Sequence, residues 1–267
     1  MAILSIDHIS FEYPNTGIKF EDLTAQFDLG ESVAIIGQNG AGKTSLSKLM
    51  MGLLKPDSGK IMIDHLDTQS HSTAEISRKV GYVFQNPDDQ IFHNNVLDEI
   101  KFGPKNIGLS KEEIERNVRH AIQLTHLDEY VDKHPYDLPY SMRKFVTIAS
   151  VLAMDPDIVI LDEPTAGQDL YSLNILADIL QSLKDRNKLV ITITHDMEFV
   201  IENFDRILVM ANRQIIADGN KEEIFSNDQI LSEAYLKRPM INRLAHDLNL
   251  GHNIFEVEEL VELLLGK

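Results

Sequence analysis

The 267-residue sequence contains no cysteine, and none of its apolar runs is long enough to span a membrane. Without cysteine the chain forms no disulfide bonds, which is typical of a cytoplasmic protein. The first residues lack the basic and apolar pattern of a signal region, so we expect no secretory leader in this sequence.

Basic residues are also scarce. The chain has 25 Lys and Arg residues against 42 Asp and Glu residues, which gives a formal net charge of −17. A surface of this charge is repelled by nucleic-acid phosphates and by anionic lipid headgroups. We therefore expect no nucleic-acid partner, and we expect any work at a membrane to go through a partner that supplies positive charge.

The spacing of apolar residues predicts an α/β protein. Strands are expected in three short apolar runs of the opening third, at 3–9, 18–27 and 32–36, and in four later runs, at 80–84, 158–161, 189–193 and 207–210. The later strands alternate with helices, which indicates a parallel sheet. Helices are predicted over about 87–153, where Ser110 and Glu113 fit a capping box, and over the acidic segment 226–267, with a turn near Gly251.

Residues 37–44 match the phosphate-binding pattern G-x-x-x-x-G-K-[ST] of the P-loop. An apolar strand precedes the loop, and Leu46, Leu49, Met50 and Leu53 follow it at helical spacing. A strand, a glycine loop and a helix in this order present backbone N–H groups to a phosphate. The residues expected to bind a nucleoside triphosphate are Gly37, Gln38, Asn39, Gly40, Ala41, Gly42, Lys43, Thr44 and Ser45, with Lys43 on the β/γ-phosphates and Thr44 on Mg²⁺.

Three later strands end in polar residues suited to phosphate chemistry. Asp162 and Glu163 follow the run at 158–161, where Asp162 can orient Mg²⁺ and Glu163 can act as general base on water. His195 ends the next strand, where it can sense and stabilise a γ-phosphate, and Gln85 ends an earlier one, where its amide can ligate Mg²⁺ or position water. Taken singly, each has a plain alternative: a solvated acidic turn, a structural histidine, or a polar residue at a strand end.

In this order, the P-loop, Gln85, Asp162 with Glu163, the segment 164–169 (the D-loop) and His195 resemble the ATP-binding subunit of an ABC transporter over nearly the whole chain. The resemblance implies an ABC-type P-loop ATPase that uses ATP and Mg²⁺. Its fold would combine an antiparallel β subdomain, an α-helical subdomain at about 87–153 and a helical C-terminal extension. Glu163, His195, Lys43 and Gln85 would be its catalytic residues. Thr44, Gln85 and Asp162 would hold the metal, and Tyr13 would stack on adenine, with Phe11 the weaker candidate and core packing the alternative for both.

A narrower resemblance concerns energy-coupling factor (ECF) transporters, which take up vitamins and metal ions. Residues 81–92 look like the Q-loop of their ATPases, and residues 239–260 resemble their C-terminal dimerisation segment. This implies a nucleotide-binding domain at 1–225 and a dimerisation segment at 226–267. It also implies three partners, namely a second ABC ATPase, a transmembrane coupling subunit whose basic helix would suit Asp88 and Asp89, and a substrate-binding membrane protein. The chain would then lie at the cytoplasmic face of the cell membrane as a peripheral protein.

The sequence departs from the ABC pattern at the signature L-S-G-G-Q, which normally precedes a helix and completes the ATP site of the opposite subunit. Its place is taken by Leu138, Pro139, Tyr140, Ser141 and Met142. Pro139 removes a hydroxyl and a backbone N–H, and Tyr140 and Ser141 add side chains where glycines allow close approach to a phosphate. We therefore expect an asymmetric heterodimer with one competent and one weak site, and an isolated chain that binds ATP but hydrolyses it slowly.

Three other functions stay open at this point. The chain could be the ATPase of a different ABC transporter, or a nucleotide-binding regulatory subunit without turnover. A soluble ABC protein acting on ribosomes or DNA is disfavoured by the net charge of −17 and by the presence of one nucleotide domain without a coiled-coil insertion.

Overall fold

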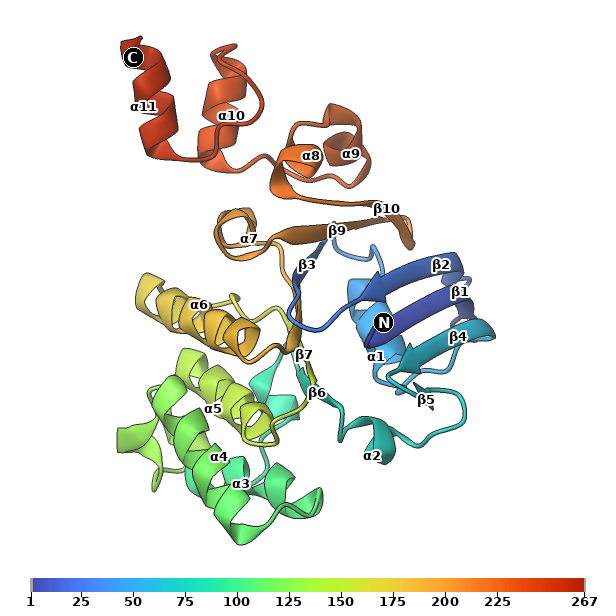
Figure 1. Cartoon of the computed structure of the whole chain (residues 1–267), viewed down its shortest axis with the longest axis vertical. Helices are drawn as coiled ribbons and strands as arrows, with labels where there is room; N and C mark the ends of the chain where they lie inside the picture. The colour runs from blue at the N-terminus through green and yellow to red at the C-terminus, as the bar shows by residue number, and fades with distance from the viewer. Residues whose placement is uncertain (1, 267) are drawn as a thin grey trace.

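The computed structural model describes residues 2–266. The molecule is elongated, with two sheets near its middle, the helices of residues 87–153 at one end and the C-terminal helices at the other (Figure 1). The α/β architecture predicted from the sequence is confirmed. No helix within residues 2–266 is both long and apolar enough to cross a membrane.

The larger sheet has six strands in the order β10-β9-β3-β8-β7-β6. Five of them are parallel, and only the edge strand β10 is antiparallel to its neighbour. Their bounds are β3 Ser32–Ile36, β6 Val80–Val83, β7 Ile158–Asp162, β8 Leu189–Ile193, β9 Arg206–Ala211 and β10 Gln214–Gly219. Parallel pairing brings the carboxyl ends of β3, β6, β7 and β8 to one edge, where ligands of such sheets bind.

A second, antiparallel sheet comes from the N-terminal part of the chain, in the order β2-β1-β4-β5. Its strands are β1 Leu4–Glu12, β2 Lys19–Phe27, β4 Ser58–Ile63 and β5 Leu66–Asp67. The sequence pattern predicts the first two. It does not predict β4, because the first three residues of that strand, 58–60, are exposed and include a glycine, so the strand lacks an alternating apolar pattern.

Helix α1, Lys43–Met50, packs between the two sheets (Figure 1). The predicted continuation of this helix to Leu53 is wrong. Gly52 adopts a left-handed φ of 67° and its N–H donates to the carbonyl of Leu49, while the N–H of Leu53 donates to Lys48 at 2.9 Å. These two bonds form a Schellman motif, which ends the helix and turns Leu53 out to 45% exposure.

The larger sheet separates two hydrophobic cores because side chains alternate across each strand. Val33 and Ile35 face the core that contains α1 and the antiparallel sheet. Ala34 and Ile36 face the core built on the helices of residues 87–153 and on α6, Leu170–Asp185. Both faces of β3 are thus fully buried, which explains its unbroken apolar sequence.

The segment predicted to be helical at about 87–153 contains no strand among its residues. It consists of η1 Pro87–Asp89, α3 Val96–Asn106, α4 Lys111–Leu124, η2 Asp128–Tyr130, η3 Pro135–Asp137 and α5 Tyr140–Leu152, and it is preceded by α2 Thr73–Ile76. The capping box predicted for α4 is present. The N–H of Glu113 donates to Ser110 Oγ at 3.2 Å, and the N–H of Ser110 donates back to Glu113 Oε2 at 2.8 Å.

The remaining helices are α6 Leu170–Asp185, α7 Met197–Asn203, α8 Lys221–Phe225, α9 Asp228–Glu233, α10 Met240–Asp247 and α11 Val257–Leu265. The predicted turn near Gly251 lies between the last two, which share a small core of Ala245, Ile254 and Leu260. Apolar side chains on the outer faces of α10 and α11 are exposed, among them Met240, Leu244, Val261 and Leu264. The division into domains at residue 225 stays a prediction.

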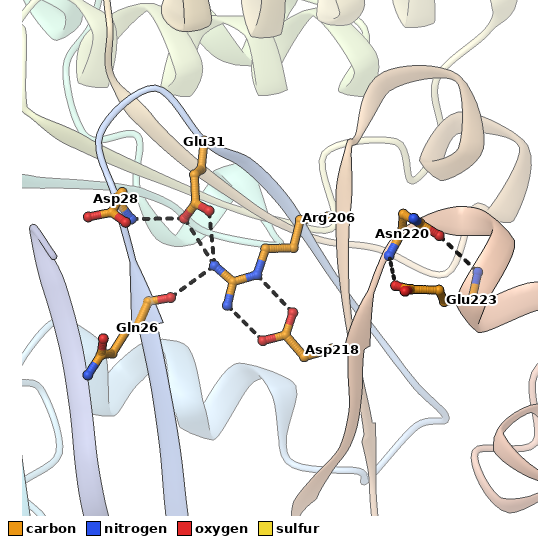
Figure 2. A network of polar contacts seen from close by, with 7 residues as sticks. All are labelled: Gln26, Asp28, Glu31, Arg206, Asp218, Asn220 and Glu223. Carbon is orange, nitrogen blue, oxygen red and sulfur yellow. Dashed lines mark hydrogen bonds and ion pairs between the residues drawn. The ribbon is translucent and has the colours of Figure 1, made fainter.

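Arg206, at the start of β9, ties the two sheets together (Figure 2). Its Nε and Nη2 donate to the two carboxylate oxygens of Asp218 on β10 at 2.8 and 2.7 Å. Its Nη1 donates to Glu31 at 3.0 and 3.1 Å and to the carbonyl oxygen of Gln26 on β2 at 2.9 Å. One guanidinium therefore joins β2, β9 and β10 through charge-assisted bonds.

Candidate functional site

The P-loop lies between the carboxyl end of β3 and the start of α1, and its glycines are required by close packing. Gly37 and Gly42 adopt φ values of 149° and 106°. A side chain at Gly37 would overlap the carbonyl of Met210 on β9, and one at Gly42 would overlap the ring of Phe20. The loop is therefore pressed against both sheets, and its backbone amides are held in a fixed arrangement.

Lys43 extends across this loop. Its ammonium donates to the carbonyl oxygens of Gly37 and Gln38 at 2.7 and 3.1 Å, and the residue is only 7% exposed. Burial lowers the pKa of Lys43, while the carboxylates of Glu163 and Asp162 act in the opposite direction. A buried cation over a cradle of amides is a suitable environment for a phosphate chain.

Two adjoining cavities flank the loop. The first, of about 300 Å³, is lined by Tyr13 and by the P-loop residues from Asn39 to Ser45, except Ala41. The second, of about 390 Å³, is lined by Gly37, Gln38 and His195. Asn39, Gln85 and Glu163 line both cavities, so the two form one continuous site around the P-loop. Arg213 also lines the first cavity, although no sequence motif marks it.

Of the two aromatic candidates for adenine stacking, Tyr13 lines the first cavity, whereas Phe11 lines neither of these two. Its hydroxyl is 3.1 Å from Ser45 Oγ, and its ring lies edge-on to Phe11 at 4.8 Å between centroids. Phe11 is 7% exposed and belongs to the core.

Asp162, at the end of β7, has one satisfied and one unsatisfied oxygen. The hydroxyl of Tyr82 donates to Oδ2 at 2.8 Å, and burial raises the pKa of Tyr82, so this phenol stays a donor. Oδ1 is buried and has no hydrogen-bond partner among residues 2–266. A buried carboxylate oxygen without a partner fits a magnesium ion or its bound water, and Thr44 and Gln85 line the adjacent cavity.

The metal would not be held by protein alone. Across residues 2–266, no three His, Asp or Glu side chains gather as a metal cage. Mg²⁺ characteristically takes one or two protein ligands and completes its shell with water and substrate phosphates. The donors present, a carboxylate, a hydroxyl and an amide, fit that mode of binding.

Glu163 and His195, predicted independently as catalytic residues, lie in contact. His195 Nδ1 is 2.7 Å from Glu163 Oε2. The carboxylate is almost buried, whereas the imidazole is 67% exposed and borders the second cavity. The histidine ring can thus fix the orientation of the carboxylate while its other side faces the site.

The backbone of Glu163 is also held on both sides. It adopts a left-handed φ of 50°, and its N–H donates to the carbonyl of Ile193 at 2.8 Å. Its own carbonyl accepts a bond of 2.5 Å from the ammonium of Lys144 on α5. Lys144 is fully buried, and this burial lowers its pKa to about 8. In the sequence, Lys144 stands out only as a flank of the replaced signature. A lysine within an otherwise apolar helix face is the signal that points to its role.

The region that replaces the signature lies outside both cavities, and residues 138–142 line neither of them. Of these residues, Leu138 and Pro139 precede α5, whereas Tyr140, Ser141 and Met142 lie in its first turn. Pro139 is the N-cap of α5 and provides no side-chain cap, and Tyr140 is 41% exposed and packs beside Gly167. Arg143, one turn on, pairs with Asp88 at 2.7 Å. This region therefore does not contribute to the cavities beside the chain's own P-loop.

Comparison with known proteins gives a consistent result. The family model described as ABC transporter matches residues 20–166. The energy-coupling factor transporter ATP-binding protein EcfA2 of Clostridium tetani is 38% identical over 276 residues, covering 99% of this chain and 96% of its own length. The structure of CbiO1 from Clostridium perfringens, part of the ABC transporter complex CbiONQ, superposes with a TM-score of 0.77 at 31% identity, covering 93% of this chain and 99% of the other.

Some relatives are longer. A Methanosarcina acetivorans protein named as an ABC transporter ATP-binding protein is 40% identical over 243 residues, which is 91% of this chain but 40% of that protein. The chain thus spans about two fifths of that relative's length.

The buried Lys144 predicts a pH dependence of stability. Its pKa is about 8 in the folded protein against 10.5 in the unfolded chain, so the charged form is penalised by folding. Burying the charged ammonium lowers the free energy of unfolding by its full amount below pH 8. This loss disappears as the pH rises from 8 towards 10.5, so the free energy of unfolding of the wild type increases over that interval. Relative to Lys144→Met, wild type should gain about 2 kcal/mol between pH 7.5 and 10, measured by urea unfolding.

The matched control for this experiment is Lys105→Met, which changes an exposed lysine at the end of α3. Its stability difference from wild type should stay constant over the same pH range. An equally constant difference for Lys144→Met would show that burial does not lower the pKa of Lys144.

Proposed function

This chain belongs to the ABC transporter family and carries the ATPase domain of that family, and from this premise we propose that it is the ATP-hydrolysing subunit of an ECF-type importer. The observation that carries the proposal is that the P-loop, Glu163 and His195 line two adjoining cavities. Asp162, whose buried Oδ1 has no hydrogen-bond partner among residues 2–266, directly precedes Glu163 in the chain. The resemblance of residues 81–92 to the ECF Q-loop and the similarity to a protein named EcfA2 support the ECF assignment.

In the proposed reaction, the P-loop amides and Lys43 bind the phosphate chain of ATP, and Tyr13 stacks on its base. The carboxylate of Glu163 takes a proton from water as the water oxygen attacks the γ-phosphorus, and the bond from that phosphorus to the β,γ-bridging oxygen breaks. His195 orients Glu163 and stabilises charge on the γ-phosphate. Thr44, Asp162 and Gln85 would hold Mg²⁺, which neutralises the charge that develops on the phosphates.

A dimer completes this site in the proposal. The chain's own signature region lies outside its cavities, so the second wall of the ATP site must come from a partner ATPase with a working signature. The exposed apolar side chains of α10 and α11 suit a dimerisation segment at 226–267. Because residues 138–142 would serve the partner's ATP poorly, we propose a heterodimer with unequal sites.

The membrane partners are a transmembrane coupling subunit and a substrate-binding protein that selects a vitamin or metal ion. The similar protein CbiO1 is itself part of a transporter complex, CbiONQ, which supports an assembly of this kind. Gln85, next to the exposed η1 segment, would pass nucleotide-driven motion to the coupling subunit. Asp88 already pairs with Arg143, so Asp89 is the better candidate for a basic coupling helix. The chain would then be peripheral at the cytoplasmic face of the membrane.

One observation favours a second candidate. The replaced signature at residues 138–142 also suits a weakly hydrolysing regulatory subunit that binds ATP chiefly to control its partner. Alternatively, the chain could be the ATPase of another kind of ABC transporter.

Glu163→Gln tests the proposed general base. The amide retains the size of the side chain and leaves the backbone bonds to Ile193 and Lys144 in place, but it cannot accept the proton. Hydrolysis by complexes purified with their native partners should fall by a factor of about 10² or more, while ATP affinity is retained. Glu112→Gln, the same change on the exposed face of α4, is the control. Undiminished turnover in Glu163→Gln would remove Glu163 as the base.

Restoring the signature tests the asymmetric dimer. The substitutions Pro139→Ser, Tyr140→Gly, Ser141→Gly and Met142→Gln recreate L-S-G-G-Q, and both sites of a homodimer then receive a working signature. Hydrolysis by the isolated chain, slow in wild type, should rise at least about tenfold when measured by phosphate release. The same variant carrying Lys43→Ala should stay inactive. Fast, cooperative hydrolysis by the wild-type homodimer would contradict the proposal.

The transport assignment is tested by identifying the proteins that co-purify with the tagged chain from detergent extracts of native membranes. A second ABC ATPase, a transmembrane coupling protein and a small substrate-binding membrane protein are expected together. An untagged chain in the same extract is the control. Recovery of a conventional permease pair would contradict the ECF assignment and support another ABC transporter.

A further inference from the structure

The turn between β9 and β10 holds an arginine in an unfavourable backbone conformation. Ala211 pairs with Gln214, so the loop has only two residues, Asn212 and Arg213, with φ values of 50° and 66°. Two-residue turns with positive φ at both positions strongly prefer asparagine followed by glycine. Asparagine is present at the first position. At the second, a long cationic side chain stands where glycine would be free of strain.

This arginine lies against the P-loop. Its backbone N–H donates to the carbonyl of Ala41 at 3.1 Å, which fastens the turn to the loop. The residue lines the same cavity of about 300 Å³ as Tyr13, Lys43 and Thr44. Strain in a surface turn that touches a binding site is a reason to look for a functional role of the strained residue.

The guanidinium also has an unsatisfied donor. Arg213 Nε is buried and has no hydrogen-bond partner among residues 2–266. A buried N–H without an acceptor is costly, and guanidinium groups bind phosphate oxygens well. An anion in the adjoining cavity would satisfy this group, in a protein whose net charge of −17 otherwise repels nucleotides.

We propose that Arg213 is a nucleotide-binding residue whose guanidinium binds the phosphate oxygens that ADP and ATP share. The position of Arg213 beside the P-loop favours these oxygens over those of the γ-phosphate. Arg213 lines the cavity that contains Tyr13 but not the one that contains His195, where the γ-phosphate is placed in the proposed reaction. The inference rests on the proposed nucleotide site and adds a residue that the P-loop motif does not include.

The variant Arg213→Gly distinguishes this proposal from the interpretation that Arg213 only stabilises the turn. Arg213→Gly removes the guanidinium and relieves the strain at φ 66°, so the melting temperature should stay equal or rise. The affinities of the purified full chain for ADP and for ATP, measured by titration calorimetry, should both fall about tenfold. Arg213→Lys keeps a charge without the planar donor fork and should lie between wild type and Arg213→Gly.

Asn212→Gly is the matched control, because it changes the same turn and relieves the same kind of strain without removing a cation. Its nucleotide affinities should equal those of wild type. Unchanged affinities in Arg213→Gly, or a loss confined to ATP, would overturn the inference. If wild-type protein bound neither nucleotide, the proposed function itself would fail.

Discussion

The geometry of the site depends on how the peptide unit of Glu163 is held. Its N–H is bound to β8 and its carbonyl to the buried ammonium of Lys144 on α5, while its carboxylate is bound to His195. A left-handed residue gains no regular secondary-structure bonds, so these contacts replace them and fix the direction of the side chain. The edge of the sheet and helix α5, whose first turn contains part of the replaced signature, are thereby joined at Glu163. A shift of α5 would therefore act on the backbone of Glu163 through this bond.

Three basic side chains of this acidic chain lie around the proposed nucleotide site. Lys43 and Arg213 border one cavity, and Lys144 lies beneath Glu163. Each of the three is brought in by a different element: the P-loop, a hairpin turn and a buried helix face. Asp162 and Glu163 supply the opposing negative charge, so the site brings both signs together among buried side chains. Interactions there are stronger than the same pairs would be at the surface.

The parts of the site that the sequence predicted are those for which local pattern and sheet topology suffice. A P-loop between strand and helix, and polar residues such as Asp162 and His195 at the ends of parallel strands, must meet at one edge. The sequence did not predict that Lys144 and Arg213 lie at the site, because their positions depend on packing between segments far apart in the chain. The end of α1 was misplaced for a local reason, since Gly52 stops the helix although the apolar spacing continues to Leu53. The half of the ATP site that we propose a partner supplies lies outside this chain, so its sequence holds no pattern for it.

Strand β3 pairs with β8 on one side and β9 on the other, and the carbonyl of Met210 on β9 closes against Gly37. Both neighbours are encoded in the last third of the sequence. During synthesis the P-loop therefore leaves the ribosome early, whereas the strands that pack against it are made late. Until then β3 lacks both of its neighbouring strands, and its unpaired edges need protection from aggregation. Because such distant pairings form slowly, ATP can act as a folding ligand only in the final stage of the chain's maturation.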